Sequence, residues 1–359
     1  MARIDSFLRL VVEQHASDLH FHAGTTPTSR YNGDLVELPF RIISEGEARR
    51  FLHEMMTPEQ QAALERDGEV DFAYTLEGAG RFRANVFHQS RGLGAVFRII
   101  PDRLPTLQEL RLPPALRKLT LMSNGLFLVT GPTGSGKSTT LAAIVHEMNA
   151  CSQRHIITVE DPIEFVHQPL QSVVSQRQVG RHTETFPAAL RSALRESPDV
   201  LVVGEMRDYE TARLAISAAE TGVLVLATLH TNSATKAIDR MIDMCPEEAQ
   251  EQVRGVVSVL LRGVLAQHLC KRLSEDGRVA VTELLFQTYA VSNLIRENKV
   301  HQLDALLQSG DSAAAGMQSL DECIIRNVRE GAIGPEEALR VANVPDLVRR
   351  QIAEIPEDA

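Results

Sequence analysis

The chain has 359 residues but only four cysteines, no long apolar run and no excess of positive charge. The cysteines are widely spaced without a C-x-x-C pair, which predicts reduced thiols and no zinc module. No apolar segment reaches the roughly 18 residues that a membrane-spanning helix needs. The N-terminus lacks an apolar core followed by small residues, so we expect no signal peptide. These absences predict a soluble cytoplasmic protein.

The charge and composition of the chain indicate which kind of soluble protein it is. A net charge of −10 disfavours a general nucleic-acid binder, because neutralising phosphates requires a basic face, so we expect no nucleic-acid partner. A hydrophobic fraction of 43% and a charged fraction of 23% indicate a globular protein, and the length suffices for about two to three domains. The most apolar stretch, residues 255–270, is predicted to form a buried helix with Arg262 at its middle.

Residues 1–100 are predicted to form a small α+β domain. Short segments of alternating apolar and polar residues are separated by Gly, Pro and Asn, and the Asn-Gly pair at 32–33 predicts a hairpin. The spacing of apolar residues predicts helices at about 4–15 and 45–56. Four prolines then interrupt residues 101–122, which we interpret as a linker.

Residues 123–288 are predicted to form the larger domain. Apolar runs alternate there with helical stretches, which is typical of βαβ units around a parallel sheet. Residues 289–359 have a helical pattern and are predicted to form a C-terminal helical region. The predicted fold class is therefore α/β, with a smaller α+β domain preceding the main sheet.

The stretch GPTGSGKS matches the phosphate-loop pattern G-x-x-x-x-G-K-[ST] completely, between an apolar strand and a helix. The glycines let backbone N–H groups point at a phosphate, and the helix N-terminus adds partial positive charge. Lys137 would reach the β and γ oxygens of ATP, and the Ser138 hydroxyl would ligate Mg²⁺. The predicted nucleotide-binding residues are Gly131, Pro132, Thr133, Gly134, Ser135, Gly136, Lys137, Ser138 and Thr139.

Polar residues follow three later strands of the same region. The run HIITV leads to an acidic stretch ending in Glu164, DVLVVG leads to Glu205, and VLVLATL leads to His230. Taken singly, each could be a turn residue or a helix cap, but ligands of open parallel sheets bind beyond the carboxyl ends of the strands. Hydrolysis needs a carboxylate that orients or deprotonates water, so Glu164 and Glu205 are candidates. We interpret the site as that of an NTPase.

Longer motifs resemble a known family. ITVEDPIEFVH, SPDVLVVGEMRD and ATLHTNSATKAIDRMIDMCPEE resemble the secretion-type ATPases that power type IV pili and type II secretion. ASDLHFHAG, GRFRANVFHQSRGLGAVFRII and NLIRENKVHQLDALLQSG are similar to its PilT-type subgroup, the pilus retraction (twitching motility) ATPases. The resemblance covers nearly the whole chain. It implies a PAS-like N-terminal domain, a RecA-like ATPase core, a homohexameric ring and a motor that depolymerises pili at an inner-membrane platform protein.

The resemblance also implies roles for individual residues. Glu164 matches a general base, Glu205 stands at an atypical Walker B position, and His230 matches a sensor of the γ-phosphate. Arg83 and Arg98 match arginine fingers that reach the nucleotide across a subunit boundary. The pattern alone would place these two arginines on a solvated strand face.

One position departs from the family pattern, because Val223 follows Gly222 where members usually have His. The valine either extends the next strand or marks an accessory, weakly active subunit that assists a retraction ATPase paralogue. A pilus-assembly or type II secretion ATPase is a second alternative, disfavoured because the chain lacks an extra N-terminal domain and a tetracysteine motif. A nucleic-acid translocase is a third, disfavoured by the acidic charge.

Asp18, His20 and His22 fall on one face of a predicted strand at period two, which is also how metal ligands are spaced. We favour a structural role, because the family carries a similar SDLH sequence without a metal.

Overall fold

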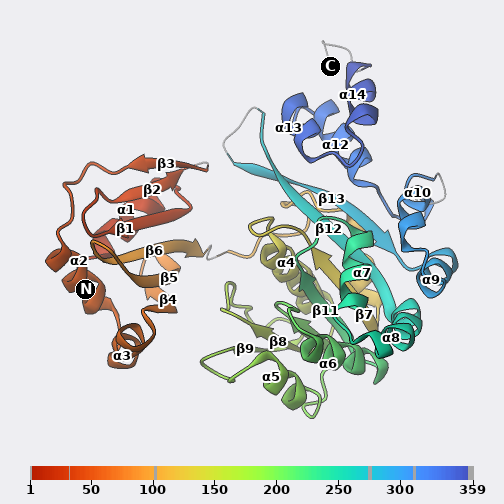
Figure 1. The fold of residues 1–359 in the computed structure, drawn as a ribbon, viewed down its shortest axis with the longest axis horizontal. Helices are drawn as coiled ribbons and strands as arrows, with labels where there is room; N and C mark the ends of the chain where they lie inside the picture. Colours follow the sequence, from red (N-terminus) through yellow and green to blue (C-terminus); the bar gives the residue numbers. More distant parts are fainter. Residues whose placement is uncertain (1, 32, 101–102, 274–276, 310–312, 355–359) are drawn as a thin grey trace. The chain divides into compact units, whose positions relative to one another are not determined.

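The computed structural model describes residues 2–354 except 32, 101–102, 274–276 and 310–312. The chain forms two compact units, Met1–Arg103 and Leu104–Ala359 (Figure 1). Asn32 and Pro101, on which the hairpin and linker predictions partly rest, lie outside the described residues. None of the described helices is both long enough and apolar enough to cross a membrane.

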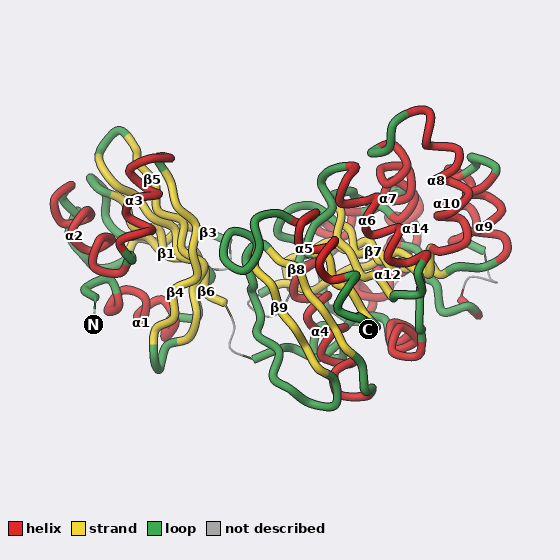
Figure 2. The backbone as a smooth tube through the Cα atoms, turned by 90° about the horizontal axis from the view of Figure 1, so that it is seen from below, coloured by secondary structure: helices red, strands yellow, loops and turns green. Residues whose placement is uncertain are grey.

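The first unit contains a six-stranded antiparallel sheet in the order β3-β2-β1-β6-β5-β4. Helices α1 and α2 lie on one side of this sheet (Figure 2). Helices α1 and α2 begin and end close to the positions predicted for them, whereas helix α3 was not predicted. Its elements are α1 (Asp5–Glu13), β1 (Asp18–His22), β2 (Thr28–Tyr31), β3 (Asp34–Glu37), α2 (Glu45–Met55), α3 (Pro58–Asp67), β4 (Glu69–Leu76), β5 (Gly80–Gln89) and β6 (Gly92–Ile100).

Alternation along the strands gives the sheet of the first unit two different faces. On β5 the side chains of Phe82, Ala84 and Val86 are buried in the apolar core of the unit. Arg83 and Asn85 lie between them in sequence and therefore point to the opposite face, because successive side chains of a strand alternate. One face of the sheet is thus apolar and packed, and the other carries arginines.

The second unit contains a seven-stranded sheet in the order β13-β12-β7-β11-β10-β8-β9. All neighbouring strands are parallel except the edge strand β13, which pairs antiparallel with β12. The elements of the sheet region are η1 (Pro114–Leu121), β7 (Gly125–Thr130), α4 (Lys137–Cys151), β8 (His155–Glu160), β9 (Val173–Gln178), α5 (Phe186–Ala193), β10 (Val200–Val203), α6 (Tyr209–Glu220), β11 (Leu224–Leu229), α7 (Ala234–Asp243), α8 (Glu247–Leu260), β12 (Leu261–Lys271) and β13 (Arg278–Phe286).

The C-terminal region is helical, and its later helices pack together against the β12–β13 pair (Figure 1). Its elements are α9 (Tyr289–Arg296), η2 (Val300–Gln302), α10 (Leu303–Leu307), α12 (Leu320–Arg329), α13 (Pro335–Val341) and α14 (Pro345–Ala353).

Strands β7, β10 and β11 are buried along their whole length, which explains their continuous apolar sequences.

The prediction of one buried helix over residues 255–270 is wrong. Helix α8 ends at Leu260, and Leu261 begins β12, which pairs with both β7 and β13. A strand buried on both faces has no polar alternation, so its apolar run resembles that of a buried helix.

The segment interpreted as a linker is mostly packed against the second unit. Leu107, Leu112, Leu116 and Leu119 are buried in the core of that unit. The prolines limit regular structure there to the 3-10 helix η1, but they do not prevent the leucines from packing.

Candidate active site

The phosphate loop connects β7 to α4, whose first residue is Lys137. Gly131 and Gly136 have positive φ values of 151° and 87°, which favour glycine. A Cβ atom on Gly131 would collide with the backbone oxygen of Gln267, and one on Gly136 would lie 2.9 Å from Gln267 Nε2. The loop therefore requires glycine at both positions for conformation and for space.

Lys137 and Ser135 are the buried polar residues of the loop. Lys137 Nζ donates to the carbonyl oxygens of Gly131 at 2.9 Å and Pro132 at 3.0 Å. Burial lowers the pKa of this amine, while the charges of Glu205 and Glu164 raise it. Ser135 Oγ is buried without a hydrogen-bond partner. An unpaired hydroxyl inside a loop of this shape fits a phosphate oxygen as its partner.

Ser138 lies exposed in the first turn of α4. A hydroxyl oxygen at this point suits Mg²⁺, which prefers oxygen ligands and retains several waters. The chain thus offers residues that fit both the nucleotide phosphates and the metal ion.

Glu205 and His230 follow the neighbouring strands β10 and β11 and lie together. His230 Nε2 is 2.8 Å from Glu205 Oε1, and Arg207 Nε donates to the same oxygen at 2.6 Å. Burial raises the pKa of Glu205, but the Arg207 hydrogen bond and the charges of His230 and Arg207 outweigh it, so the pKa lies below its ordinary value. Glu205 is therefore ionised at neutral pH. Arg207 was not among the site residues predicted from the sequence, although a cation two residues after the glutamate was a usable signal.

Glu160 and Glu164 occupy the acidic stretch after β8. Glu160 accepts hydrogen bonds from Thr158 Oγ1 at 2.6 Å and Gln176 Nε2 at 3.1 Å, and the backbone N–H of Glu164 also bonds to it. Burial raises the pKa of Glu160. These bonds anchor the segment that carries Glu164, whose charge acts on Lys137.

Gly204 stands close to the end of β8. A Cβ atom at this position would lie 3.0 Å from the Val159 oxygen and 3.2 Å from Glu160 Cα. A larger residue would push the strand ends apart, so glycine suits this position.

Gln267 is a second residue that the sequence analysis missed. It lies on β12 with 3% of its surface exposed and hydrogen bonds to Ser135 of the loop and to Thr140 of α4. Only the position of β12 beside β7 reveals it, and the sequence carries no local signal for that position.

Arg83 and Arg98 belong to the first unit, where they lie opposite each other on β5 and β6. Arg98 Nε donates to Asp18 Oδ1 at 2.8 Å, and Arg83 Nε lies 3.7 Å from Asp71 Oδ1. The side chains of Arg98 and Arg83 are 62% and 36% exposed. Both guanidinium groups thus lie on the arginine-bearing face of the sheet, and each has a carboxylate beside its Nε atom.

Asp18 pairs with arginines in this sheet. Its carboxylate is 3.8 Å from Arg30 Nε on the side opposite Arg98, and Ser17 Oγ donates to it at 2.7 Å. The rings of His20 and His22 stack 6.0 Å apart, and burial lowers the pKa of both. Of the three residues with the spacing of metal ligands, Asp18 thus already has protein groups as its partners.

Comparison with known proteins assigns the family. A model for type II/IV secretion system proteins matches residues 1–340. The chain belongs to this family. It is 46% identical to the type IV pilus retraction ATPase PilT of Pseudomonas aeruginosa, over 96% of this chain and 99% of the relative. A twitching motility protein of Neisseria gonorrhoeae is also 46% identical, over 88% of this chain and 84% of the relative.

Solved structures of the family have the same fold. A crystal structure of the pilus retraction motor PilT with bound ADP matches with a TM-score of 0.87 and 41% identity, covering 98% of this chain and 99% of the other. The Legionella pneumophila ATPase DotB matches with a TM-score of 0.81 and 26% identity, covering 94% and 95%. These matches confirm the predicted family and the predicted fold, a RecA-like α/β core with a smaller N-terminal domain.

Val223, the departure from the family pattern, lies immediately before β11. It is 8% exposed within the apolar core, and its carbonyl oxygen accepts a hydrogen bond from Gly125 N at 3.2 Å. His230 lies beyond the other end of the same strand, about 23 Å away at roughly 3.3 Å per residue. The valine is thus a core residue at the sheet edge opposite the phosphate loop.

Proposed function

We propose that this chain is an ATP-hydrolysing motor that drives type IV pilus retraction. The observation that carries the proposal is the convergence of Lys137, Glu164, Glu205 and His230 at one edge of the parallel sheet. Full-length identity of 46% to a protein named as a type IV pilus retraction ATPase supports the same activity.

The phosphate loop would hold the β- and γ-phosphates of ATP. Lys137 exchanges its bonds to the Gly131 and Pro132 carbonyl oxygens for phosphate oxygens, because its amine already lies inside the loop. The Ser135 hydroxyl would gain a phosphate oxygen as its partner, and the Ser138 hydroxyl would help to hold Mg²⁺. The metal, when bound, supplies positive charge to the β and γ oxygens.

The two glutamates take different roles. Glu205 has a lowered pKa and is a weak base, so it suits orienting water and the hydration shell of the metal. Glu164 is the proposed general base. His230 touches Glu205, so a γ-phosphate that attracts His230 would also release this carboxylate. This pair would couple the state of the nucleotide to the geometry of the site.

Arg83 and Arg98 are proposed to act in a neighbouring subunit of a homohexameric ring. An arginine supplied in trans stabilises charge on the transferred phosphoryl group and accelerates hydrolysis by about 10³–10⁵. Hydrolysis then depends on subunit contact, which a mechanical ring requires. We place the ring in the cytoplasm, at the inner-membrane platform protein of the pilus, with a retraction paralogue as a further partner.

The test is ATP turnover measured against molecular mass by light scattering, with mixed rings as the decisive step. Arg83→Ala and Lys137→Ala are each expected to lack turnover, and mixing them should restore active interfaces that combine an intact loop with an intact arginine. Arg49→Ala, which removes an exposed arginine from α2, is the control and should keep turnover. Mixed rings without turnover contradict the trans role, and a wild-type hexamer without turnover favours an accessory subunit.

A further inference from the structure

Strand β12 brings one buried amide against the phosphate loop. Gln267 Nε2 donates to the Ser135 carbonyl oxygen at 2.6 Å, and Thr140 Oγ1 donates to Gln267 Oε1 at 2.7 Å. The side chain therefore uses both ends of its amide, one on the loop and one on the first turn of α4. The bond from Thr140 has an ordinary length for an O–H···O bond, and the bond to Ser135 is slightly shorter than usual for an N–H···O bond.

The bond to Ser135 fixes the orientation of a peptide group in the loop. A trans peptide is planar, so the C=O of Ser135 and the N–H of Gly136 point in opposite directions. With the carbonyl oxygen turned toward Gln267, the N–H of Gly136 must point away from β12. Backbone N–H groups are what a phosphate loop offers to its ligand, so the orientation of this peptide matters for phosphate binding.

The bond to Thr140 fixes the helix relative to the same amide. Thr140 is 1% exposed, and its backbone N–H donates to the Gly136 oxygen at 2.9 Å. Gln267 thereby links the loop and the helix N-terminus to one strand. The tight space at Gly131 and Gly136, both of which face atoms of Gln267, shows how closely this residue packs against the loop.

We propose that Gln267 is a positioning residue that holds the phosphate loop in the shape that binds nucleotide phosphates. It acts through Ser135 and Thr140 and does not itself touch the nucleotide. The inference rests on the proposed nucleotide site, but it is independent of the arginines and of ring assembly. A residue that only packed the core would affect folding, whereas a positioning residue affects the binding of phosphates more than that of the nucleoside.

The test measures the affinity of the full chain for ADP and for adenosine by calorimetry. Gln267→Leu removes both hydrogen bonds at similar volume, and we expect ADP affinity to fall by about 10-fold while adenosine affinity stays unchanged. Gln287→Leu is the control, because the Gln287 amide also uses both of its ends: Nε2 donates, with its shortest bond to the Val259 oxygen at 2.9 Å, and Oε1 accepts from Arg262 Nη1 at 2.8 Å. Gln287 follows β13 and contacts Arg262 near the start of β12, so this variant should leave ADP affinity unchanged.

Thr140→Val and Thr140→Ser keep the proposal testable if Gln267→Leu does not fold. The valine removes the hydroxyl group and should weaken ADP binding, and the serine keeps it and should restore binding. Equal ADP affinity in Gln267→Leu and the wild type, or an equal loss for adenosine, overturns the inference. If the wild-type chain binds ADP no better than adenosine, the proposed nucleotide site itself fails.

Discussion

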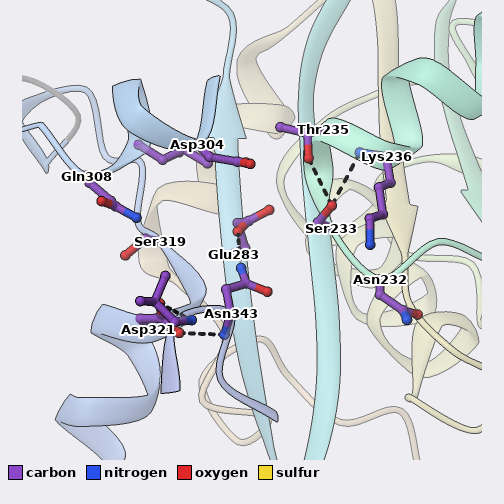
Figure 3. Close-up of a pocket in the computed structure, with 12 residues that line it drawn as sticks. Asn232, Ser233, Thr235, Lys236, Glu283, Asp304, Gln308, Ser319, Asp321 and Asn343 are labelled. Atoms are coloured by element: carbon purple, nitrogen blue, oxygen red, sulfur yellow. Dashed lines mark hydrogen bonds between the residues drawn. The ribbon is translucent and has the colours of Figure 1, made fainter. Parts of the chain in front are cut away.

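Replacing Glu283 with glutamine should change how the stability of the second unit depends on pH. Glu283 lies on β13 with 3% of its surface exposed. It accepts hydrogen bonds from Ala234 N at 2.8 Å and from Asn343 Nδ2 at 3.3 Å. It also lines a pocket of about 270 Å³ together with Asp304 and Asp321 (Figure 3).

The magnitude follows from the pKa of Glu283. Burial raises it from 4.5 to about 7; the Ala234 hydrogen bond opposes the rise, and the charges of Asp304 and Asp321 add to it. Between pH 4.5 and 7 the folded state keeps a proton that the unfolded state has released, so the free energy of unfolding falls as pH rises. A shift of about 2.5 pKa units corresponds to a contribution of about 3 kcal/mol to the free energy of unfolding. This contribution is present at low pH and is lost in full above pH 7.

The assay is urea unfolding followed by circular dichroism, because the chain has no tryptophan for fluorescence. Glu283→Gln keeps an acceptor for Ala234 N but cannot ionise. Relative to the wild type, the variant should gain about 2.5 kcal/mol in free energy of unfolding between pH 5 and pH 8. Glu248→Gln, which removes an exposed carboxylate from α8, controls for the loss of one negative charge. A difference between Glu283→Gln and the wild type that stays constant from pH 5 to pH 8 would refute the reasoning.

Three further variants test the site. Lys137→Ala should weaken ADP binding in calorimetry while the circular dichroism spectrum stays native, and unchanged binding would contradict the role of the loop. Glu205→Ala should retain ADP binding and lower turnover by about 10² or more, measured as phosphate release. Equal turnover would remove Glu205 from the mechanism. Val223→His should leave turnover unchanged, because it lies far from the loop, and a large gain would show that the family histidine matters.

Much of the site could be predicted because its signals are local. The phosphate loop needs glycines and a lysine at fixed spacing. The ends of buried strands are also visible, because polar residues follow apolar runs such as HIITV. Parallel strands place their carboxyl ends on one edge, so Glu164, Glu205 and His230 could be grouped from the order of their strands alone. The hydrogen bonds of these residues could not be predicted, because the contact of Arg207 with Glu205 depends on how the side chains beyond the end of β10 are oriented.

The error over residues 255–270 and the omission of Gln267 have one cause. Strand β12 is covered on both sides, so its sequence lacks the alternation that marks a half-buried strand. If the segment is interpreted as a helix, nothing places Gln267 at the phosphate loop, and the residue is an isolated polar one in an apolar run. The pairing of β12 with β7 is what places Gln267 beside the turn at Ser135.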